Sequence, residues 1–246
     1  MTDKRSLLEA YREKPYRNIF VALIAVVLID ALAPDTVARG RFSDLLVVAV
    51  LLAALFETVR SRHNAILAMV LGVPAVVVRI VTAYRTDTTM QNTTVLGLTA
   101  VFFVFLVWNL LHDLNRSDRS TSERIFGALC AYIFIGMLFA LLYTHMAYRD
   151  HEAFAISNPA IMQAATSEAS LIPVFTYYSF VTLTTLGYGD ITPVAEHVRT
   201  LAWLEALIGQ LYLAVMVAGF VATHISESMR KNRSDPPSDD SEGGAL

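Results

Sequence analysis

Cysteine and charge are both scarce in this sequence. Its 246 residues include a single cysteine, Cys130, so one chain can build neither a disulfide framework nor a thiolate metal cluster. We interpret Cys130 as a small packed hydrophobe. Charged residues make up only 17% of the chain, its net charge is −3, and it has no basic block suited to nucleic acid. No nucleophile–base or metal-ligand spacing occurs in its loops, so we expect neither an enzyme nor an organic cofactor.

Apolar residues are abundant instead. They make up 55% of the chain, which is too many for an ordinary soluble domain. A helix of about 20 residues crosses the hydrocarbon core of a bilayer. We therefore predict an all-α integral membrane protein, surrounded by lipid, with six transmembrane helices near residues 18–34, 43–59, 64–84, 93–111, 124–148 and 197–226.

Basic residues cluster on one side of the six predicted helices. The opposite loops hold only Arg39, Arg41, Arg85 and Arg149. The positive-inside rule therefore predicts that both termini are cytoplasmic and that the segment between the fifth and sixth helices lies outside. From the compact chain we expect a bacterial inner membrane. The residues on the predicted cytoplasmic side are Lys4, Arg5, Arg12, Lys14, Arg17, Arg60, Arg62, Arg116, Arg119, Arg124, Arg230, Lys231 and Arg233.

The fourth predicted helix, 93–111, contains no lysine or arginine. A voltage-sensing helix would carry such a residue at every third position, because charges that cross the field supply the gating energy. We therefore predict weak or absent voltage dependence. Asp30 and Arg79 lie at matching depths in the first and third helices, and they either form an ion pair or extend separately to the interface. The polar residues from Asn109 to Asp113 we interpret as a solvated helix cap.

The most informative segment runs from Thr184 to Asp190 and reads Thr-Thr-Leu-Gly-Tyr-Gly-Asp. Gly187 and Gly189 reach positive φ at little steric cost, so successive carbonyl groups can point the same way. These carbonyls, with the Thr185 hydroxyl, could replace the water shell of a monovalent cation. One chain supplies one wall of such a cage, so the motif predicts a homotetramer with the pore on its axis.

Residues 182–190 resemble the selectivity-filter signature of tetrameric potassium channels, with Leu186 where valine is more usual. An isolated glycine-rich turn is the alternative interpretation, and the apolar helices on both sides disfavour it. The resemblance implies a channel through which K⁺ flows passively. It also implies a K⁺-binding filter, with Thr184 and Asp190 as supporting residues, made of Thr185, Leu186, Gly187, Tyr188 and Gly189.

Pro173 suits the first turn of a helix, so residues 173–184 are predicted to form a re-entrant pore helix that ends at the filter. By resemblance, Tyr177 should hydrogen-bond Asp190 and Tyr178 should brace Tyr188. The alternative is that both tyrosines are simple packing aromatics. Val181 occupies the position at which some bacterial members have a glutamate. Residues 147–171, before the pore helix, are predicted to be a solvated outer loop.

The last helix carries the residues that we assign to gating. Gly209 falls at the position of the family's hinge glycine, and either bending or close packing would explain it; Gly219 is a second flexible point. Glu205 lies in an apolar span, and we expect it to hydrogen-bond the back of the pore helix. His224 could open the bundle by repulsion among protonated copies, or it could simply cap the helix. The predicted cavity and gate residues, by family register, are Gln210, Leu213, Val217, Val221 or Phe220, and His224.

These inferences divide the chain into five parts. Residues 1–17 are either an interfacial helix or a frayed tail, 18–112 a four-helix bundle, 113–123 a linker, 124–226 the pore domain and 227–246 a disordered tail. We expect a potassium-selective homotetrameric channel. The alternatives are a voltage-gated potassium channel with non-standard sensor charges and a potassium transporter subunit. The sequence leaves open whether pH, lipid, tension or a separate regulatory subunit sets the gate.

Overall fold

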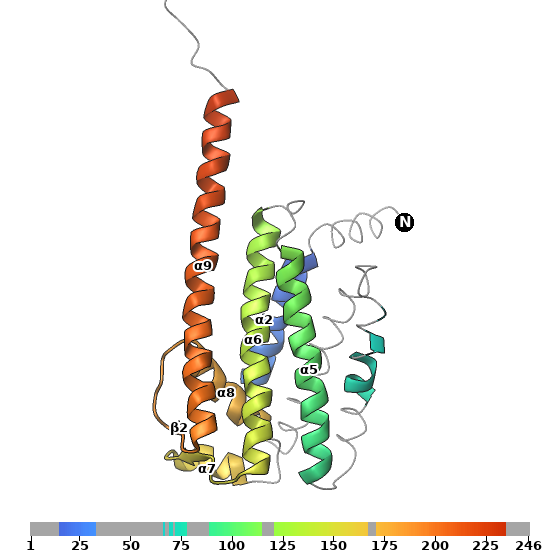
Figure 1. Ribbon diagram of the computed structural model, residues 1–246, viewed down its shortest axis with the longest axis vertical. Helices are drawn as coiled ribbons and strands as arrows, with labels where there is room; N and C mark the ends of the chain where they lie inside the picture. Colours follow the sequence, from blue (N-terminus) through green and yellow to red (C-terminus); the bar gives the residue numbers. More distant parts are fainter. Residues whose placement is uncertain are drawn as a thin grey trace, which may run out of the picture.

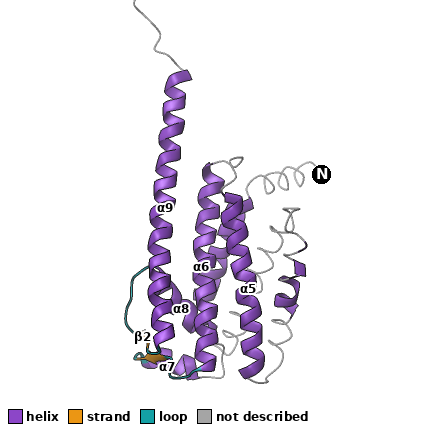
Figure 2. Ribbon diagram, viewed as in Figure 1, coloured by secondary structure: helices purple, strands orange, loops and turns teal. Residues whose placement is uncertain are grey.

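The structure, a computed structural model, describes residues 15–32, 66, 69–70, 72–77, 89–114, 121–166 and 171–234. Within these ranges the chain is mostly helical, as predicted, and Figure 2 shows its long helices lying roughly side by side. The helices are α2 (Pro15–Leu32), α5 (Thr89–Leu114), α6 (Thr121–Arg149), α7 (Pro159–Thr166), α8 (Ile172–Leu183) and α9 (Glu196–Ser234).

Three of these helices are long and apolar enough to cross a membrane: Leu96–Leu114, Thr121–Arg149 and Glu196–Ser226. They coincide with the fourth, fifth and sixth predicted spans. Helix α2 covers most of the first predicted span. The second and third lie largely outside the described residues. Arg79 and the side chain of Asp30 lie outside them too, so the proposed ion pair stays a prediction. The count of six spans therefore stays a prediction.

Helices α2, α5 and α6 pack around one apolar core. Phe102 and Phe103 of α5 are fully buried, and the ring of Phe103 meets that of Phe134 on α6 edge to face, with centroids 6.0 Å apart. Apolar side chains at helical spacing explain this packing, because they place a continuous buried stripe on each helix. Cys130 lies in the same core and is fully buried, as its interpretation as a packed hydrophobe requires.

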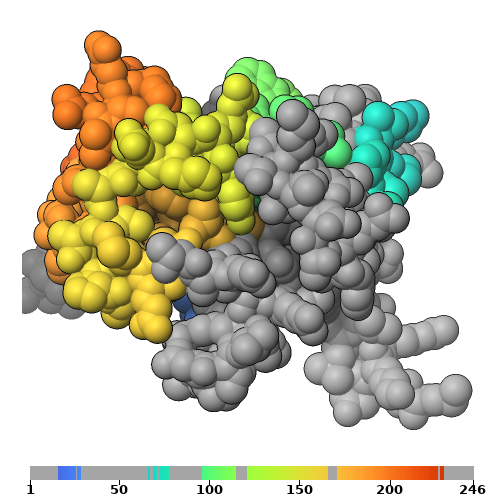
Figure 3. Space-filling model, turned by 90° about the horizontal axis from the view of Figure 1, so that it is seen from below, coloured from blue at the N-terminus to red at the C-terminus, as the bar shows by residue number. Residues whose placement is uncertain are grey.

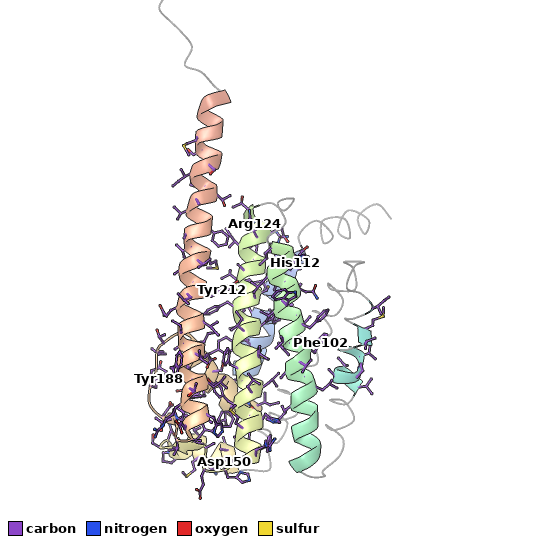
Figure 4. The ribbon with its side chains drawn as sticks, viewed as in Figure 1. Phe102, His112, Arg124, Asp150, Tyr188 and Tyr212 are labelled. Atoms are coloured by element: carbon purple, nitrogen blue, oxygen red, sulfur yellow. The ribbon has the colours of Figure 1, made fainter. Side chains whose placement is uncertain are left out.

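A polar cluster joins the start of α2 to the end of α5 and the start of α6. The backbone N–H of Tyr16 donates to the Glu123 carboxylate at 2.9 Å, and the Tyr16 hydroxyl donates to Asp113. Asp113 is therefore a partner of α2, rather than only the solvated cap predicted from the sequence. Figure 4 shows His112 and Arg124 at this same end of the bundle and Asp150 at the opposite end.

Helices α6 and α9 run in opposite directions, and α8 lies against both of them (Figure 1). From α8 the chain returns through a loop to β2 (Ile191–Pro193), which lies beside the start of α9. β2 pairs antiparallel with β1 (Phe154–Ile156), so that Ala155 faces Thr192. The segment predicted as a solvated outer loop therefore contains a strand and α7. The sequence did not reveal β1, because a strand of three residues has no measurable periodicity.

Candidate functional site

The predicted filter is the loop that follows α8. This helix begins at Ile172, with Pro173 in its first turn, and ends at Leu183, within one residue of the predicted bounds. Proline fits here because the first backbone N–H groups of a helix have no partner within it. The backbone N–H of Thr184 donates to the Phe180 carbonyl at 3.1 Å, which closes the last turn directly before the filter.

The backbone of the loop alternates in handedness. φ is 58° at Thr185, 56° at Gly187 and 79° at Gly189, whereas Leu186 and Tyr188 between them do not have positive φ. The glycines adopt positive φ as the sequence predicted, but Thr185 was not foreseen. A β-branched residue in this region is a genuine outlier, with a cost of about 1–3 kcal/mol. Alternation of this kind turns successive peptide groups, so that like dipoles can project from one side of the chain.

Hydrogen bonds to the end of α8 hold the first part of the loop, residues 185–187. The Val181 carbonyl accepts from the backbone N–H of Leu186 at 2.9 Å and from that of Gly187 at 3.3 Å. The N–H of Thr185 donates to the Thr182 carbonyl at 2.9 Å. These bonds offset the strain at Thr185. Val181 thus supports the loop through its backbone, a role that does not depend on its side chain.

One tyrosine supports the last part of the loop, at Tyr188 and Asp190. The hydroxyl of Tyr177 donates to the Asp190 carboxylate at 2.5 Å, which is the contact that the resemblance implied. The ring of Tyr177 also stacks on Tyr188, with centroids 6.5 Å apart and planes 7° apart. Tyr178, which was expected to brace Tyr188, is buried instead against the rings of Tyr143, Phe154 and Phe175. Within one chain, Tyr177 makes both contacts, because adjacent helical residues face different sides.

The segment before α8 holds the end of the loop. The Asp190 carbonyl accepts from the backbone N–H of Ser157 at 2.9 Å and from the Ser157 hydroxyl at 3.2 Å. The pairing of β1 with β2 continues this contact. Figure 3, which looks from the end that carries α7, shows the yellow segment of α7 and β1 beside the orange segment that leads into α9. Sequence reasoning missed Ser157, since nothing in its own surroundings indicates a partner 33 residues away.

Helix α9 touches the end of α8 and the predicted filter at Gly209 and Gln210. A Cβ atom on Gly209 would lie 2.2 Å from the Leu183 carbonyl oxygen, so the two backbones approach too closely for any other residue. Of the two explanations for Gly209, the structure therefore supplies close packing. The Gln210 amide donates to the Thr185 hydroxyl at 3.0 Å, so this predicted cavity residue contacts the first part of the loop.

Glu205, one turn before Gly209, is fully buried and reaches the back of α8 as predicted. Its carboxyl group lies 2.5 Å from the Ser179 hydroxyl and 2.7 Å from the Tyr143 hydroxyl. Ser179 belongs to α8 and Tyr143 to α6, so this contact joins three helices. The sequence identified Glu205 by its charge in an apolar span, whereas Ser179 and Tyr143 carried no such signal.

The predicted gate residues farther along α9 lie on two different sides of the helix. Val217 and Val221 are exposed, Leu213 is half-buried and His224 is exposed. Phe220 and Gly219, by contrast, line a cavity of about 240 Å³ between α5, α6 and α9, together with Leu111, Leu114, Arg124 and Tyr212. We call the exposed side of α9 that carries Val217 and Val221 its free face. Of the two alternatives for the constriction, Val221 thus lies on the free face, whereas Phe220 is turned towards α5 and α6 of its own chain.

Residues 184–189 of the loop are all exposed in the single chain, including the large side chains of Leu186 (55%) and Tyr188 (66%). Figure 4 shows Tyr188 on the side of the molecule away from α5 and Phe102. Exposed apolar groups next to a strained, well-anchored backbone are typical of a surface that takes part in binding.

The chain resembles known proteins in this region. Residues 153–225 match the family described as "Ion channel", a range that contains α8, the loop and most of α9. Protein LctB of Bacillus caldotenax is 34% identical over 86 residues, or 35% of this chain and 61% of that protein. Protein LctB of Geobacillus stearothermophilus is 37% identical over 79 residues, or 32% of this chain and 56% of that protein.

A plant protein named "Two-pore potassium channel 3", from Arabidopsis thaliana, is 26% identical over 110 residues, covering 45% of this chain and 21% of that protein. No solved structure matches. The chain spans little more than half the length of the two bacterial relatives. The match to the ion channel family covers residues 153–225 and therefore includes the loop 184–190.

Proposed function

We propose that this chain forms the pore of a potassium-selective channel, in which the filter is shared by four copies around one axis. K⁺ binds to the backbone carbonyls of residues 185–188 and to the Thr185 hydroxyl, with Gly189 at the outer mouth. The loss of hydration is then offset by oxygen ligands at fixed positions. Both termini lie on the cytoplasmic side of a bacterial inner membrane, and α8 enters from the outside.

The alternating backbone of Thr185, Gly187 and Gly189 is the observation that carries this proposal. An isolated glycine-rich turn would need neither a threonine at positive φ nor braces on both sides of the loop. Here the end of α8 holds residues 185–187 of the loop, and Tyr177 holds the last part of the loop through Asp190. These supports hold the carbonyl groups of the loop in place, and the size of the site and the number and dipoles of its oxygen ligands are what selectivity depends on.

The exposure of the loop supports assembly around an axis. Residues 184–189 and the free face of α9 would border the pore or a neighbouring subunit, so that their apolar groups are covered in the complex. Isologous or ring-forming contacts between identical chains are the usual route to closed symmetry. Val217 and Val221 then form the apolar constriction, and a ring of such side chains can gate by excluding water.

Current through the purified protein in a planar bilayer tests the proposal, with potassium on one side and sodium on the other. We expect a reversal potential close to the potassium equilibrium value and little change of open probability with voltage. Reversal near zero would contradict potassium selectivity. Steep voltage activation would contradict the inference from the absence of basic residues in 93–111 and favour a voltage-gated channel.

Gly187→Ala and Gly219→Ala form a matched pair for the filter itself. An added Cβ meets no atom within 4 Å at either position in the single chain, but only Gly187 has positive φ. We expect Gly187→Ala to abolish selective conduction, because alanine cannot adopt this backbone without strain of about 1–2 kcal/mol in each of four subunits. Gly219→Ala should conduct selectively. Equal behaviour of the two variants in the same bilayer recording would rule out the proposed filter.

Gating by protonation of His224, by lipid or by a regulatory subunit remains a prediction. His224 is exposed near the far end of the apolar part of α9. If it drives opening by mutual repulsion, His224→Gln should remove the proton dependence of open probability. A proton dependence that persists in this variant would remove His224 from the mechanism.

A further inference from the structure

A ring of polar groups, joined by three hydrogen bonds and closed through the α6 segment between Gly136 and Tyr143, lies in the apolar interior behind the filter. It runs from the Tyr143 hydroxyl on α6 to the Glu205 carboxyl on α9, then to the Ser179 hydroxyl on α8, and back to the Gly136 carbonyl on α6. Tyr143, Ser179 and Glu205 are all fully buried. Buried polar groups need hydrogen-bond partners, since each unsatisfied group costs about 1–3 kcal/mol. The positions of the protons in this ring can therefore be counted.

Ser179 has one hydroxyl proton but lies close to two oxygen atoms. Its Oγ is 2.7 Å from the Gly136 carbonyl oxygen and 2.5 Å from Oε1 of Glu205. Both distances belong to O–H···O hydrogen bonds, and each bond needs a proton of its own. A carbonyl oxygen has none to give, so the proton between Ser179 and Gly136 must come from Ser179. The proton between Ser179 and Glu205 must then come from Glu205.

The other carboxyl oxygen fits the same assignment. Oε2 of Glu205 lies 2.7 Å from the Tyr143 hydroxyl, which donates to it. A neutral carboxylic acid offers one donor and retains acceptor capacity, which matches this site, whereas a carboxylate accepts only. Both partners of Glu205 are uncharged hydroxyl groups, and an ionised carboxylate in an apolar span is costly unless a charge compensates it. The geometry and the surroundings therefore favour the same state.

We propose that Glu205 is a neutral carboxylic acid in the folded protein and is a positioning residue, holding α8 against both α6 and α9 through its two hydrogen bonds. This inference rests on the proposed function only where it concerns selectivity. The turn of α9 from Glu205 to Gln210 meets the pore helix and filter at three points: Ser179, the Leu183 carbonyl and the Thr185 hydroxyl. A change in Glu205 thus alters the position of α8 relative to α6 and α9, and with it the position of the filter residues that follow α8.

Glutamine at position 205 provides a sharp test. Its amide N–H can donate to Ser179 while its carbonyl accepts from Tyr143, so it reproduces the neutral acid in both shape and hydrogen bonding. Leucine removes both bonds and leaves two buried hydroxyl groups with fewer partners. Glu196→Gln, at the exposed start of the same helix, makes the same chemical change where no burial is involved and serves as the control.

The experiment compares the wild type, Glu205→Gln, Glu205→Leu and Glu196→Gln in lipid vesicles with potassium. Infrared difference spectra should show the carbonyl stretch of a protonated carboxylic acid in the wild type and in Glu196→Gln, and its loss in Glu205→Gln. The melting temperature of the assembled protein should be unchanged in Glu205→Gln and lower by several degrees in Glu205→Leu. The reversal potential should likewise be unchanged in Glu205→Gln and should shift away from the potassium equilibrium value in Glu205→Leu.

Three results would overturn the proposal. The first is a wild-type spectrum without a protonated-acid band assignable to Glu205. The second is a Glu205→Gln protein as unstable as Glu205→Leu; in both cases an ionised carboxylate would be the native state. The third is a Glu205→Leu protein as stable as the wild type, which would remove the positioning role. The spectra and melting temperatures do not require conduction, so a failure of the proposed channel function would be recognised separately in the reversal potential.

Discussion

The two long helices on either side of the loop 184–190 differ sharply in how they are covered. In α6, 61% of the most apolar stretch is buried within the chain, whereas in α9 the corresponding share is 6%. Both are apolar enough to span a membrane. Helix α6 is surrounded by α2, α5, α8 and α9 of the same chain, but α9 contacts α6 and α8 along only part of its length. Helix α6 is a scaffold within one chain, and α9 presents a surface to something outside it.

The buried residues of α9 lie near its start, at Val198, Ala202, Glu205 and Gly209. Of these, the turn that carries Glu205 and Gly209 faces α8. Above and below this turn, large apolar side chains such as Trp203 and Val215 are exposed. A helix whose turn from Glu205 to Gln210 is held in this way can keep its contact with the loop 184–190 while its far end, beyond Tyr212, moves. Under the proposed function, the fixed stretch from Glu205 to Gln210 would bear on selectivity and the exposed far part of α9 on assembly and gating.

The largest expected effect concerns what covers the free face of α9. We predict that Val221→Cys forms disulfide-linked dimers under mild oxidation in membranes, because copies at an axial constriction come close enough for a disulfide. Val104→Cys on α5 is a matched control, since the two valines are exposed to nearly the same extent, 53% and 54%. It should remain monomeric on a denaturing gel.

The unmodified chain is the blank for this experiment, because Cys130 is fully buried. Light scattering of the uncrosslinked protein should give four subunits. Crosslinking of both variants to the same extent, or a monomer by light scattering, would show that α9 faces lipid as α5 does, and the contrast between the helices would lose its meaning.

The next effect breaks the fixed stretch. In Gly209→Ala the new Cβ would lie 2.2 Å from the backbone oxygen of Leu183, and backbone cannot move aside as a side chain can. We expect a loss of about 1–3 kcal/mol per subunit, as in other overpacked sites, together with reduced potassium selectivity. Thermal unfolding in detergent and bilayer recording measure the two consequences.

Gly219→Ala is the control for this prediction, because no atom of the chain lies within 4 Å of its added Cβ. It should leave stability unchanged or raise it by about 0.5–1 kcal/mol, the usual gain when alanine replaces a glycine inside a helix. If Gly209→Ala were equally stable and altered only the opening rate, bending rather than close packing would explain Gly209.

The smallest expected effect concerns the second attachment of α9 to α6. The Tyr212 hydroxyl donates to the Ala128 carbonyl at 2.7 Å, and its ring lies 5.7 Å from that of Tyr132. Tyr212→Phe keeps the ring contact and removes the hydrogen bond, so we expect a loss of about 1 kcal/mol. The melting temperature should fall while potassium selectivity is retained. A loss of selectivity would mean that the fixed stretch extends beyond Gln210.

Sequence reasoning predicted the local features of this protein well. Helix α8 lies within one residue of its expected bounds because proline and the apolar run act on the backbone locally. Gly187 and Gly189 have the predicted positive φ for the same reason. Tyr177 and Glu205 contact the groups named from the sequence, Asp190 and the back of the pore helix. In these cases either a resemblance or a charge in an apolar span singled out the residue.

Other parts of the site could not be foreseen. The stacking of Tyr177, rather than Tyr178, on Tyr188 depends on the rotation of α8 about its own axis, which neighbouring helices set. Ser157 and β1 join the site through pairing with residues more than 30 positions later, and a strand so short has no pattern of its own. The positive φ of Thr185 contradicts its intrinsic preference and persists because several hydrogen bonds hold it.

The sequence by itself determined that the chain is apolar, helical and built around the loop 184–190, because hydropathy and the conformational freedom of glycine act over a few residues. Only the tertiary structure decided which side chains support that loop. The approach of Gly209 to Leu183 and the ring through Glu205, Ser179 and Tyr143 depend on where three helices cross. Such contacts follow from close packing of the whole interior, in which the position of each helix is set by all its neighbours at once.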